Sequence, residues 1–216
     1  MRRRLPEATQ TVARKDDIRQ RALDELRRYE VLMLDGHFDY GNGYHGPAYL
    51  NPHQLLRYPS TIWRLAQDLL DLVPDDVTSA ADVVAGPPTG GALLAHTIAG
   101  LLDSRRSLTH PPCSFAPFEK KGKTPSLRPF YQHLVKGRRV LLADDVRNTG
   151  QMVAECAERV RDAGGVVLAV VCICDRLEAI ADPGVPVYPL VEYPAPPNYA
   201  AADCPLCLAG VGITTF

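Results

Sequence analysis

The sequence predicts an α/β protein with a doubly wound, mainly parallel sheet flanked by helices and a small hood built from both the N-terminal and the C-terminal parts. Strand-like segments such as "ADVVAG" and "RVLLA" alternate with helical patterns along the chain, which is typical of strand–helix–strand units. A third segment, "VVLAVVCICDR", is almost continuously apolar. We therefore expect helices to bury both of its faces, as in a parallel sheet.

The bulk composition fits one globular domain with a short attachment. The chain has 216 residues, 46% of them hydrophobic, and a formal net charge of −1, which gives no general attraction to nucleic acid. No apolar run reaches the roughly 18 residues of a membrane span. We expect a basic tail at residues 1–15 and a single domain at 16–216, with a core at about 60–185 and a hood at about 36–55 and 186–216.

The first third of the chain predicts two helices and a hairpin. Apolar residues recur at helical spacing between Asp16 and Leu34. "HFDYGNGYHGPAYLNP" has aromatic segments on both sides of "GNG", which predicts a hairpin. A second helix is expected after Ser60, which can cap it, and before Pro74, which would end it.

The elements that follow the first core strand alternate in the same way. "PPTG" predicts a turn and "GALLAHTIAGLL" an apolar helix. "PCSFAPFEKKGKTPSLRPF" predicts a strand and then a charged loop, and "QMVAECAERVRDAGG" a helix closed by glycine. The proline-rich "YPAPPNYAAADCPLC" is expected to pack across the surface.

The six cysteines indicate a reducing, cytoplasmic location rather than a disulfide framework. Cys156, Cys172 and Cys174 fall in helical or apolar patterns, where a free thiol acts as a small hydrophobe. Cys204 and Cys207 have half of the spacing of a zinc site, but the sequence contains no second pair. A turn with two free thiols is therefore the favoured interpretation of "CPLC".

Polar residues follow three of the predicted strands, in "GPPTGG", "DDVRNTG" and "DR". Ligands of open parallel sheets bind beyond these carboxyl ends. Asp144 and Asp145 can accept hydrogen bonds from a sugar diol or from water on magnesium. Neighbouring strand residues point to opposite faces, so a bidentate pair requires the strand to end at these acids. The alternative is a pair of exposed loop aspartates.

The turn after the acids leads directly into a helix, whose first amides and positive dipole end favour an anion. Thr149 adds a hydroxyl donor, and Gly150 allows the backbone to approach closely. Carboxylates for a diol beside amides for a phosphate suit a ribose 5-phosphate.

These residues resemble a known family. "VLLADDVRNTG" is similar to the phosphoribosyl pyrophosphate (PRPP) signature of the type I phosphoribosyltransferases. Within that family the chain most resembles the orotate phosphoribosyltransferases. "FDYGNGYHGPAYLN" is similar to their hood, "VVAGPPTGGALLA" to their pyrophosphate loop, "FEKKGKTPSLRPF" to their mobile basic loop, "CDRLE" to the strand end that holds the base, and "NYAAADCPLCLAG" to an ending of a bacterial and archaeal branch.

The resemblance implies transfer of phosphoribose from PRPP to orotate, with Mg²⁺ as cofactor and a homodimer with shared active sites. The residues implied for PRPP are Thr89, Gly90, Gly91, Asp144, Asp145, Val146, Arg147, Asn148, Thr149, Gly150 and Gln151. Asp144 and Asp145 would hold magnesium through water or the ribose hydroxyls. The catalytic residues implied are Lys120, Lys121, Lys123, Arg128 and Asp145. The residues implied for the base are Tyr49, Leu50, Asn51, Asn148 and Arg176.

Arg176 is a candidate ligand-binding residue even without the resemblance, because it directly follows a long apolar strand. A guanidinium fixed at a strand end can fork onto a planar carboxylate, such as that of orotate. The alternative is a surface ion pair with Asp175 or Glu178.

The phosphate turn departs from the family pattern at three positions. Asn148 and Met152 stand where hydroxyl residues are usual, and Arg147 stands where a small or apolar residue is usual. Arg147 would either reach the phosphate or point to solvent. Two alternative functions follow: a PRPP-dependent transferase for another base, or a PRPP- or nucleotide-binding regulator with weak or no turnover. The basic loop argues against the regulator, because only the chemistry needs pyrophosphate handling.

Overall fold

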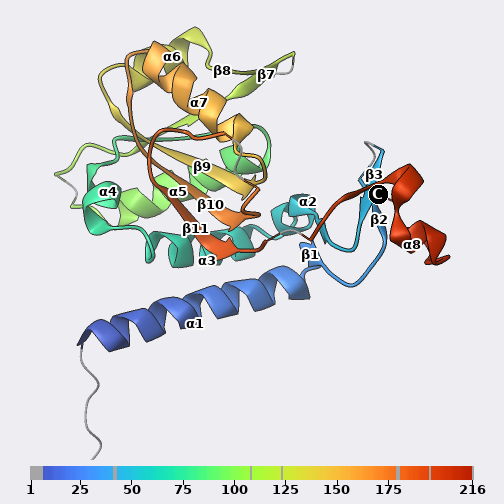
Figure 1. The fold of residues 1–216 in the computed structure, drawn as a ribbon. Helices are drawn as coiled ribbons and strands as arrows, with labels where there is room; N and C mark the ends of the chain where they lie inside the picture. The colour runs from blue at the N-terminus through green and yellow to red at the C-terminus, as the bar shows by residue number, and fades with distance from the viewer. Residues whose placement is uncertain are drawn as a thin grey trace, which may run out of the picture.

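The central element of the computed structural model is a parallel sheet of five strands in the order β11–β10–β9–β5–β6. The structure describes residues 7–40, 43–107, 109–122, 124–178, 181–194 and 196–215, with side chains from residue 12 onward. The predicted doubly wound fold is confirmed (Figure 1). The strands are β5 (Val83–Gly86), β6 (Ser114–Pro117), β9 (Arg139–Arg147), β10 (Val166–Asp175) and β11 (Val187–Glu192).

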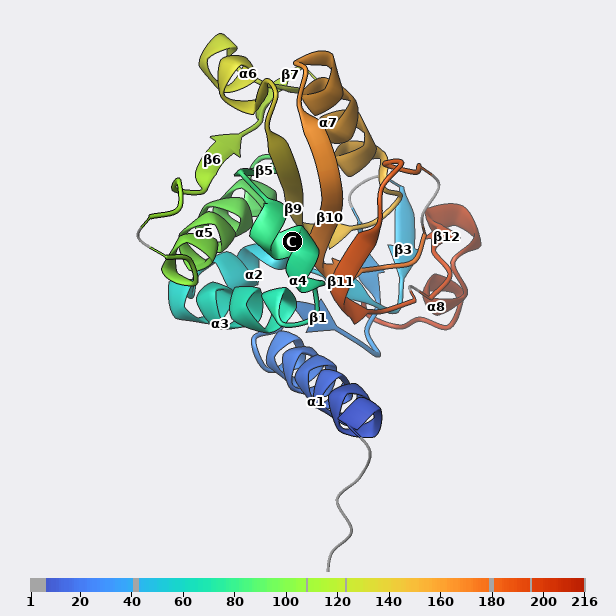
Figure 2. The same cartoon turned by 90° about the vertical axis from the view of Figure 1, so that its left-hand side faces the viewer.

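Helices cover both faces of this sheet, and Figure 2 shows α5 and α7 on opposite sides of β9 and β10. Side chains of β9 alternate between two apolar clusters because successive strand residues point to opposite faces. Leu141 and Ala143 pack in the cluster of α1, α3 and α5, and Val140 and Leu142 pack in the cluster of α7. The long helices are α1 (Glu7–Arg28), α3 (Pro59–Leu70), α5 (Gly90–Ser104) and α7 (Gln151–Asp162).

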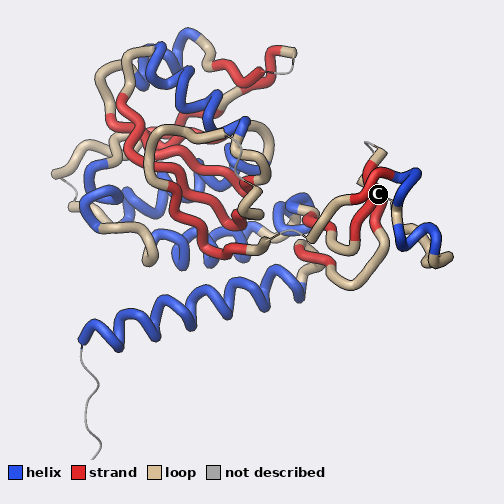
Figure 3. The backbone as a smooth tube through the Cα atoms, viewed as in Figure 1, coloured by secondary structure: helices blue, strands red, loops and turns tan. Residues whose placement is uncertain are grey.

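The hood stands beside the carboxyl ends of the core strands (Figures 1 and 3). Its sheet has the order β12–β3–β2, so the C-terminal strand pairs with the predicted hairpin. A second hairpin, β7–β8, projects from the core. The short strands are β1 (Leu32–Met33), β2 (Phe38–Asp39), β3 (Tyr44–Gly46), β4 (Tyr49–Leu50), β7 (Glu119–Lys121), β8 (Thr124–Ser126) and β12 (Tyr199–Ala200). The short helices are α2 (Pro52–Leu56), α4 (Asp75–Ala80), α6 (Pro129–Val135), η1 (Ala201–Asp203) and α8 (Pro205–Leu208).

The expected tail at residues 1–15 extends too far, because α1 already begins at Glu7. The first turns of α1 carry few apolar residues, so the sequence shows no helical periodicity there. Ion pairs hold the polar face of α1 against α3 and the turn after it: Arg21 lies 2.6 Å from Asp68, and Arg14 lies 3.2 Å from Asp71.

Three other boundaries differ from the prediction. The second helix begins at Pro59 with Tyr58 as its N-cap residue, since proline suits the first helical position. Ser60 is therefore not the cap, and Pro74 precedes α4 rather than ending α3. β11 is an edge strand of the core sheet, so the C-terminal part of the hood begins after Glu192 rather than at residue 186.

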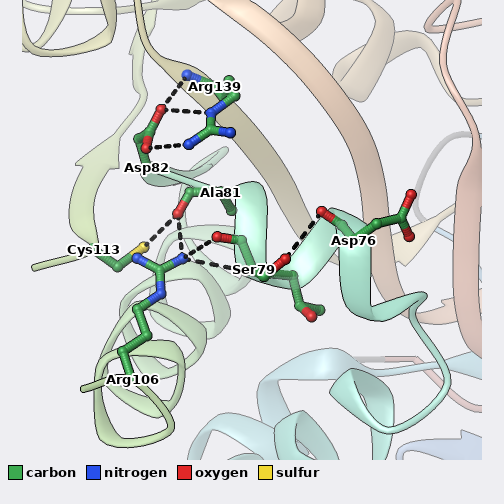
Figure 4. A network of polar contacts seen from close by, with 8 residues as sticks. Asp76, Ser79, Ala81, Asp82, Arg106, Cys113 and Arg139 are labelled. Atoms are coloured by element: carbon green, nitrogen blue, oxygen red, sulfur yellow. Dashed lines mark hydrogen bonds and ion pairs between the residues drawn. The ribbon is translucent and has the colours of Figure 1, made fainter. Parts of the chain in front are cut away.

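The amino ends of β5 and β9 are held together by charge-assisted hydrogen bonds (Figure 4). Asp82 accepts hydrogen bonds from the backbone and the guanidinium of Arg139, each at 3.0 Å, and these bonds lower the pKa of Asp82. Arg106 donates to the carbonyl oxygen of Ala81 at 2.5 Å. The polar turns lie at the opposite, carboxyl ends of the same two strands.

Candidate active site at the carboxyl ends of the strands

The polar turns meet at the topological switch point of the sheet, where ligands of doubly wound folds bind. From β5 the chain winds outward to β6, whereas from β9 it winds the other way to β10 and β11. β5 pairs with β9 only as far as Ala85 opposite Leu142. β9 continues beside β10 to Arg147, opposite Asp175. The last residues of β9 are therefore open on the side where β5 has ended.

Two glycines bring the turn after β5 against the acids of β9. A Cβ at Gly90 would lie 1.8 Å from Oδ2 of Asp145, and one at Gly91 would lie 2.8 Å from Oδ1 of Asp144. A side chain at Gly90 would thus overlap the carboxylate. Thr89 is the N-cap residue of α5, and the Pro88–Thr89 peptide bond is cis. The predicted pyrophosphate residues and the acid pair are therefore neighbours.

Asp144 and Asp145 lie within β9, so the expectation that the strand ends at these acids is wrong. The pairing with β10 continues through both residues. In the alternation of β9, Asp144 falls on the α7 side and Asp145 on the α5 side, so they do not form one bidentate pair on a single face. The amide of Asp145 donates to Oδ1 of Asp144 at 3.0 Å, and the amide of Val146 donates to Oδ1 of Asp145 at 2.9 Å.

The two acids differ in environment. Asp144 is 7% exposed, whereas Asp145 is half-buried. Burial, and then the charge of Asp145, raise the pKa of Asp144 well above its usual value. Asp144 is therefore suited to hold a proton, which leaves Asp145 as the carboxylate that faces the pyrophosphate turn.

The turn between β9 and α7 encloses a pocket of about 100 Å³. It is lined by Asp144, Val146, Arg147, Asn148, Thr149, Gly150, Gln151, Met152 and Val153. Gly150 has φ 81°, and a Cβ there would lie 2.5 Å from the carbonyl oxygen of Ala181, so this position requires glycine. Met152 also packs on the apolar cluster of α7. The predicted phosphate residues are thus gathered around one pocket at the start of α7.

The side chain of Arg147 is buried and paired rather than exposed to solvent. It is 8% exposed, and its Nη1 donates to Oδ2 of Asp175 at 2.7 Å. Its Nε is buried and has no hydrogen-bond partner among the described residues. Arg147 also lines the pocket, so its guanidinium lies beside the phosphate turn.

Arg176 lies directly after β10, as predicted, and its side chain is 18% exposed. Nη2 forms an ion pair with Oε1 of Glu178 at 2.9 Å, one of the alternatives open from the sequence. Nη1 donates to Oδ1 of Asn148 at 3.2 Å, a contact that the sequence did not predict. Asn148 thus links the phosphate turn to the base-side arginine.

Tyr40, which was not among the predicted site residues, lies in the hood near Arg176. Burial raises the pKa of Tyr40, and the positive charge of Arg176 opposes this shift. The Tyr40 ring stacks with that of Tyr49 at a centroid distance of 6.2 Å, and its hydroxyl donates to the carbonyl oxygen of Ala48 at 2.7 Å. The aromatic "FDY" run is the sequence signal that pointed to this position.

The other predicted base-side residues hold the hood to the core. Leu50 pairs with Leu32 and packs against the core cluster of α1. The amide of Asn51 donates to the carbonyl oxygen of Val31 at 2.7 Å. Of the predicted segment, Tyr49 is the residue in ring contact with Tyr40.

Of the predicted basic residues, Lys120, Lys121 and Arg128 do not line the pocket at the start of α7. Lys120 and Lys121 are exposed on β7, in the hairpin that projects from the core (Figure 1). Lys123 lies outside the described residues. Arg128 is also exposed, and it forms an ion pair with Glu119 at 2.5 Å.

The fold and the polar turns at its switch point define the class of the protein: a type I phosphoribosyltransferase. Solved structures of this class share the fold. An orotate phosphoribosyltransferase from Aeropyrum pernix matches with a TM-score of 0.60 and 23% identity over 78% of this chain and 92% of its own. The Mycobacterium tuberculosis orotate phosphoribosyltransferase in complex with PRPP matches with a TM-score of 0.52 and 17% identity over 83% and 89%.

Sequence comparison with curated relatives identifies the family within this class. The orotate phosphoribosyltransferase of Acidithiobacillus ferrooxidans is 34% identical over 86% of this chain and 90% of its own length. That of Erythrobacter litoralis is 33% identical over 90% and 95%. No protein-family profile matches the chain. The chain belongs to the orotate phosphoribosyltransferase family.

Proposed function

We propose that the chain transfers phosphoribose from PRPP to orotate, giving orotidine 5-phosphate and pyrophosphate in pyrimidine nucleotide synthesis. One observation carries the proposal: Gly90 lies against Asp145, which joins the pyrophosphate turn to the acid strand at the switch point. The names of the curated relatives support orotate as the base. The PRPP complex of a protein with the same fold supports PRPP as the donor.

The pocket at the start of α7 would bind the 5-phosphate. Amides at a helix start attract an anion, and Thr149 is exposed beside them. The Nε of Arg147, which has no partner among the described residues, would supply a further charged donor to the phosphate from the wall of this pocket. This donor offsets the hydroxyl that Met152 lacks.

The ribose diol and the pyrophosphate would lie between β9 and the start of α5. Asp145 accepts hydrogen bonds from the diol, and the backbone of Thr89, Gly90 and Gly91 approaches the pyrophosphate, because glycine leaves room there. Asp144 supports Asp145 by accepting the hydrogen bond of its amide.

Magnesium fits this region because carboxylate oxygens are the ligands it prefers. Asp145, half-buried beside the end of β5, would hold the hydrated ion through water or the ribose hydroxyls, with Asp144 behind it. When bound, the ion supplies positive charge that stabilises the departing pyrophosphate.

The base would lie under the hood, between Arg176 and the rings of Tyr40 and Tyr49. The Arg176 guanidinium suits the carboxylate of orotate, because its donors form a planar fork. The ring nitrogen of orotate is already acidic and needs no strong general base. The task of the site is then to hold this nitrogen in line with C1 of the ribose as pyrophosphate leaves.

Lys120, Lys121 and Arg128 would act in a homodimer, on the pyrophosphate bound to the neighbouring subunit. Their exposure and the projection of the β7–β8 hairpin support this assignment. A loop that closes over the crevice also keeps water from hydrolysing PRPP. Among the described helices, none is long and apolar enough to cross a membrane. All six cysteines are free thiols, which supports a reducing, cytoplasmic setting.

The test is to incubate the purified protein with PRPP, Mg²⁺ and each of orotate, uracil, adenine, guanine and hypoxanthine, and to measure pyrophosphate release. Release with orotate alone is expected. Release with another base instead of orotate would make the protein a different transferase. PRPP binding without release on any base would make it a regulator.

A further inference from the structure

Four side chains from opposite ends of the chain converge in the hood, away from the crevice. His37 precedes β2, His45 lies on β3, and Cys204 and Cys207 lie at the start and within α8. One nitrogen or sulfur atom from each lies within 4.8 Å of those of the other three. His37, His45 and Cys204 are buried, and Cys207 closes the group from the exposed side.

Four of the six distances between these atoms fit a tetrahedral metal site, and the other two are within 4.8 Å. Nε2 of His37 lies 3.3 Å from Nδ1 of His45, which lies 3.3 Å from Sγ of Cys207. Nε2 of His37 lies 3.5 Å from Sγ of Cys204 and 3.6 Å from Sγ of Cys207. Tetrahedral bonds of roughly 2.0–2.3 Å to zinc place ligand atoms roughly 3.3–3.8 Å apart.

The outer nitrogens of both rings face oxygen acceptors. Nδ1 of His37 lies 2.9 Å from the carbonyl oxygen of Val211. A carbonyl only accepts, so this nitrogen carries the proton and Nε2 presents a lone pair to the cluster. Nε2 of His45 lies 3.9 Å from Oδ1 of Asp39, and this carboxylate favours the proton on that side. With both protons on the outer nitrogens, the inner nitrogens face each other across 3.3 Å, and their two lone pairs can bind one cation. Such outer partners are typical of metal-binding histidines.

We propose that His37, His45, Cys204 and Cys207 bind one Zn²⁺ ion in a closed structural site that ties the C-terminal segment to the hood. Two sulfur and two nitrogen ligands select zinc over magnesium, because thiolate and imidazole are soft or borderline ligands. Four protein ligands leave no open position, so the site is structural rather than catalytic.

The position of the site explains why the hood needs it. The hood sheet consists of strands of two or three residues, and so few residues provide little apolar burial. Zinc adds a link between the hairpin and α8 that does not depend on a core. The hairpin between His37 and His45 also carries Tyr40, the aromatic residue near Arg176.

A functional consequence follows, and it rests on the proposed function. Loss of zinc would loosen the hairpin that holds Tyr40 and raise the KM for orotate several-fold. The KM for PRPP would change less, because the phosphate turn belongs to the core.

The test begins with the metal content of the full-length protein, purified under reducing conditions and dialysed against zinc. We expect about one zinc per chain by mass spectrometry, and a lower Tm after chelation. Cobalt in place of zinc gives the visible absorption bands of tetrahedral thiolate coordination. These readouts do not depend on turnover, so the zinc proposal and the proposed function can fail separately.

Cys207→Ser is the informative variant, because Cys207 is the exposed ligand and the change is small. It should lose most of its zinc and its cobalt bands. Cys113→Ser, which alters a free thiol that packs in the core cluster of α5, should retain both. A protein that takes up no zinc or cobalt while its thiols are reduced, or a disulfide between Cys204 and Cys207 in the freshly isolated protein, would overturn the proposal.

Discussion

The guanidinium of Arg147 forms a buried ion pair with Asp175, with Nη1 and Oδ2 2.7 Å apart beneath the phosphate turn. The pair joins the last residues of β9 and β10. It therefore fixes both the turn that follows β9 and the start of the segment that carries Arg176. Arg147, which departs from the family pattern, thus stabilises the phosphate turn through its ion pair with Asp175.

The first prediction concerns this pair. Asp175→Ala should lower the free energy of unfolding by about 3–5 kcal/mol, because it leaves a buried cation without its partner. Urea unfolding monitored by circular dichroism measures the change. Asp162→Ala, which removes an exposed ion pair with Arg159, should cost at most about 1 kcal/mol. Equal costs for the two variants would mean that Arg147 does not depend on Asp175.

The second prediction concerns the glycine that touches the acid strand. Gly90→Ala should weaken PRPP binding at least tenfold, because its Cβ would overlap the Asp145 carboxylate. Isothermal titration calorimetry with PRPP and Mg²⁺ measures this loss.

Gly100→Ala is the matched control in the same helix. No described atom lies within 4 Å of a Cβ built there, so PRPP affinity should not change, and the helix should gain up to about 1 kcal/mol. If both variants bind PRPP as the unchanged protein does, the turn after β5 is not part of the PRPP site.

The third prediction separates the base site from the phosphate site. Arg176→Ala should raise the KM for orotate at least tenfold, because the planar guanidinium is lost, and should change the Kd for PRPP much less. Glu178→Gln removes the ion-pair partner of Arg176 and keeps the guanidinium, so it should retain most of the affinity for orotate. Losses of equal size in orotate and PRPP binding after Arg176→Ala would make Arg176 a structural residue.

The fourth prediction concerns the buried acid. The pKa of Asp144 is raised in the folded protein, so between its unfolded pKa of about 3.9 and its folded pKa the folded state binds the extra proton. The contribution of the Asp144 proton to the free energy of unfolding is therefore fully present below the unfolded pKa. It is lost as the pH rises through the folded pKa.

Asp144→Asn, which is neutral at every pH, should therefore be more stable than the unchanged protein at neutral pH, and the gain should shrink towards pH 4. Urea unfolding across a pH series measures this difference. A gain that does not depend on pH, or a loss at neutral pH, would show that Asp144 is not held protonated.

The sequence predicted the core because its strands are apolar on both faces. β5, β9 and β10 were all expected from such runs. The acids were expected just after the strand, whereas Asp144 and Asp145 lie within β9, which continues to Arg147. β11 was missed because it lies at the sheet edge and contains Pro189, which an edge strand tolerates.

Contacts between distant segments could not be predicted from spacing. Cys204 and Cys207 showed half of a metal site, and the other half, His37 and His45, lies at the opposite end of the chain. The buried pairing of Arg147 depends in the same way on Asp175 of the next strand. In each case the missing partner is supplied by the fold rather than by neighbours in sequence.

Phosphoribosyl transfer to orotate at the carboxyl ends of β5 and β9 is measured most directly as orotidine 5-phosphate formation by the purified protein. The fall in orotate absorbance should depend on both PRPP and Mg²⁺. Asp145→Asn should reduce kcat/KM for PRPP at least tenfold, since it removes the carboxylate that faces the pyrophosphate turn. No product from the unchanged protein would rule out transfer to orotate, and equal rates for the two proteins would rule out a role for Asp145 in it.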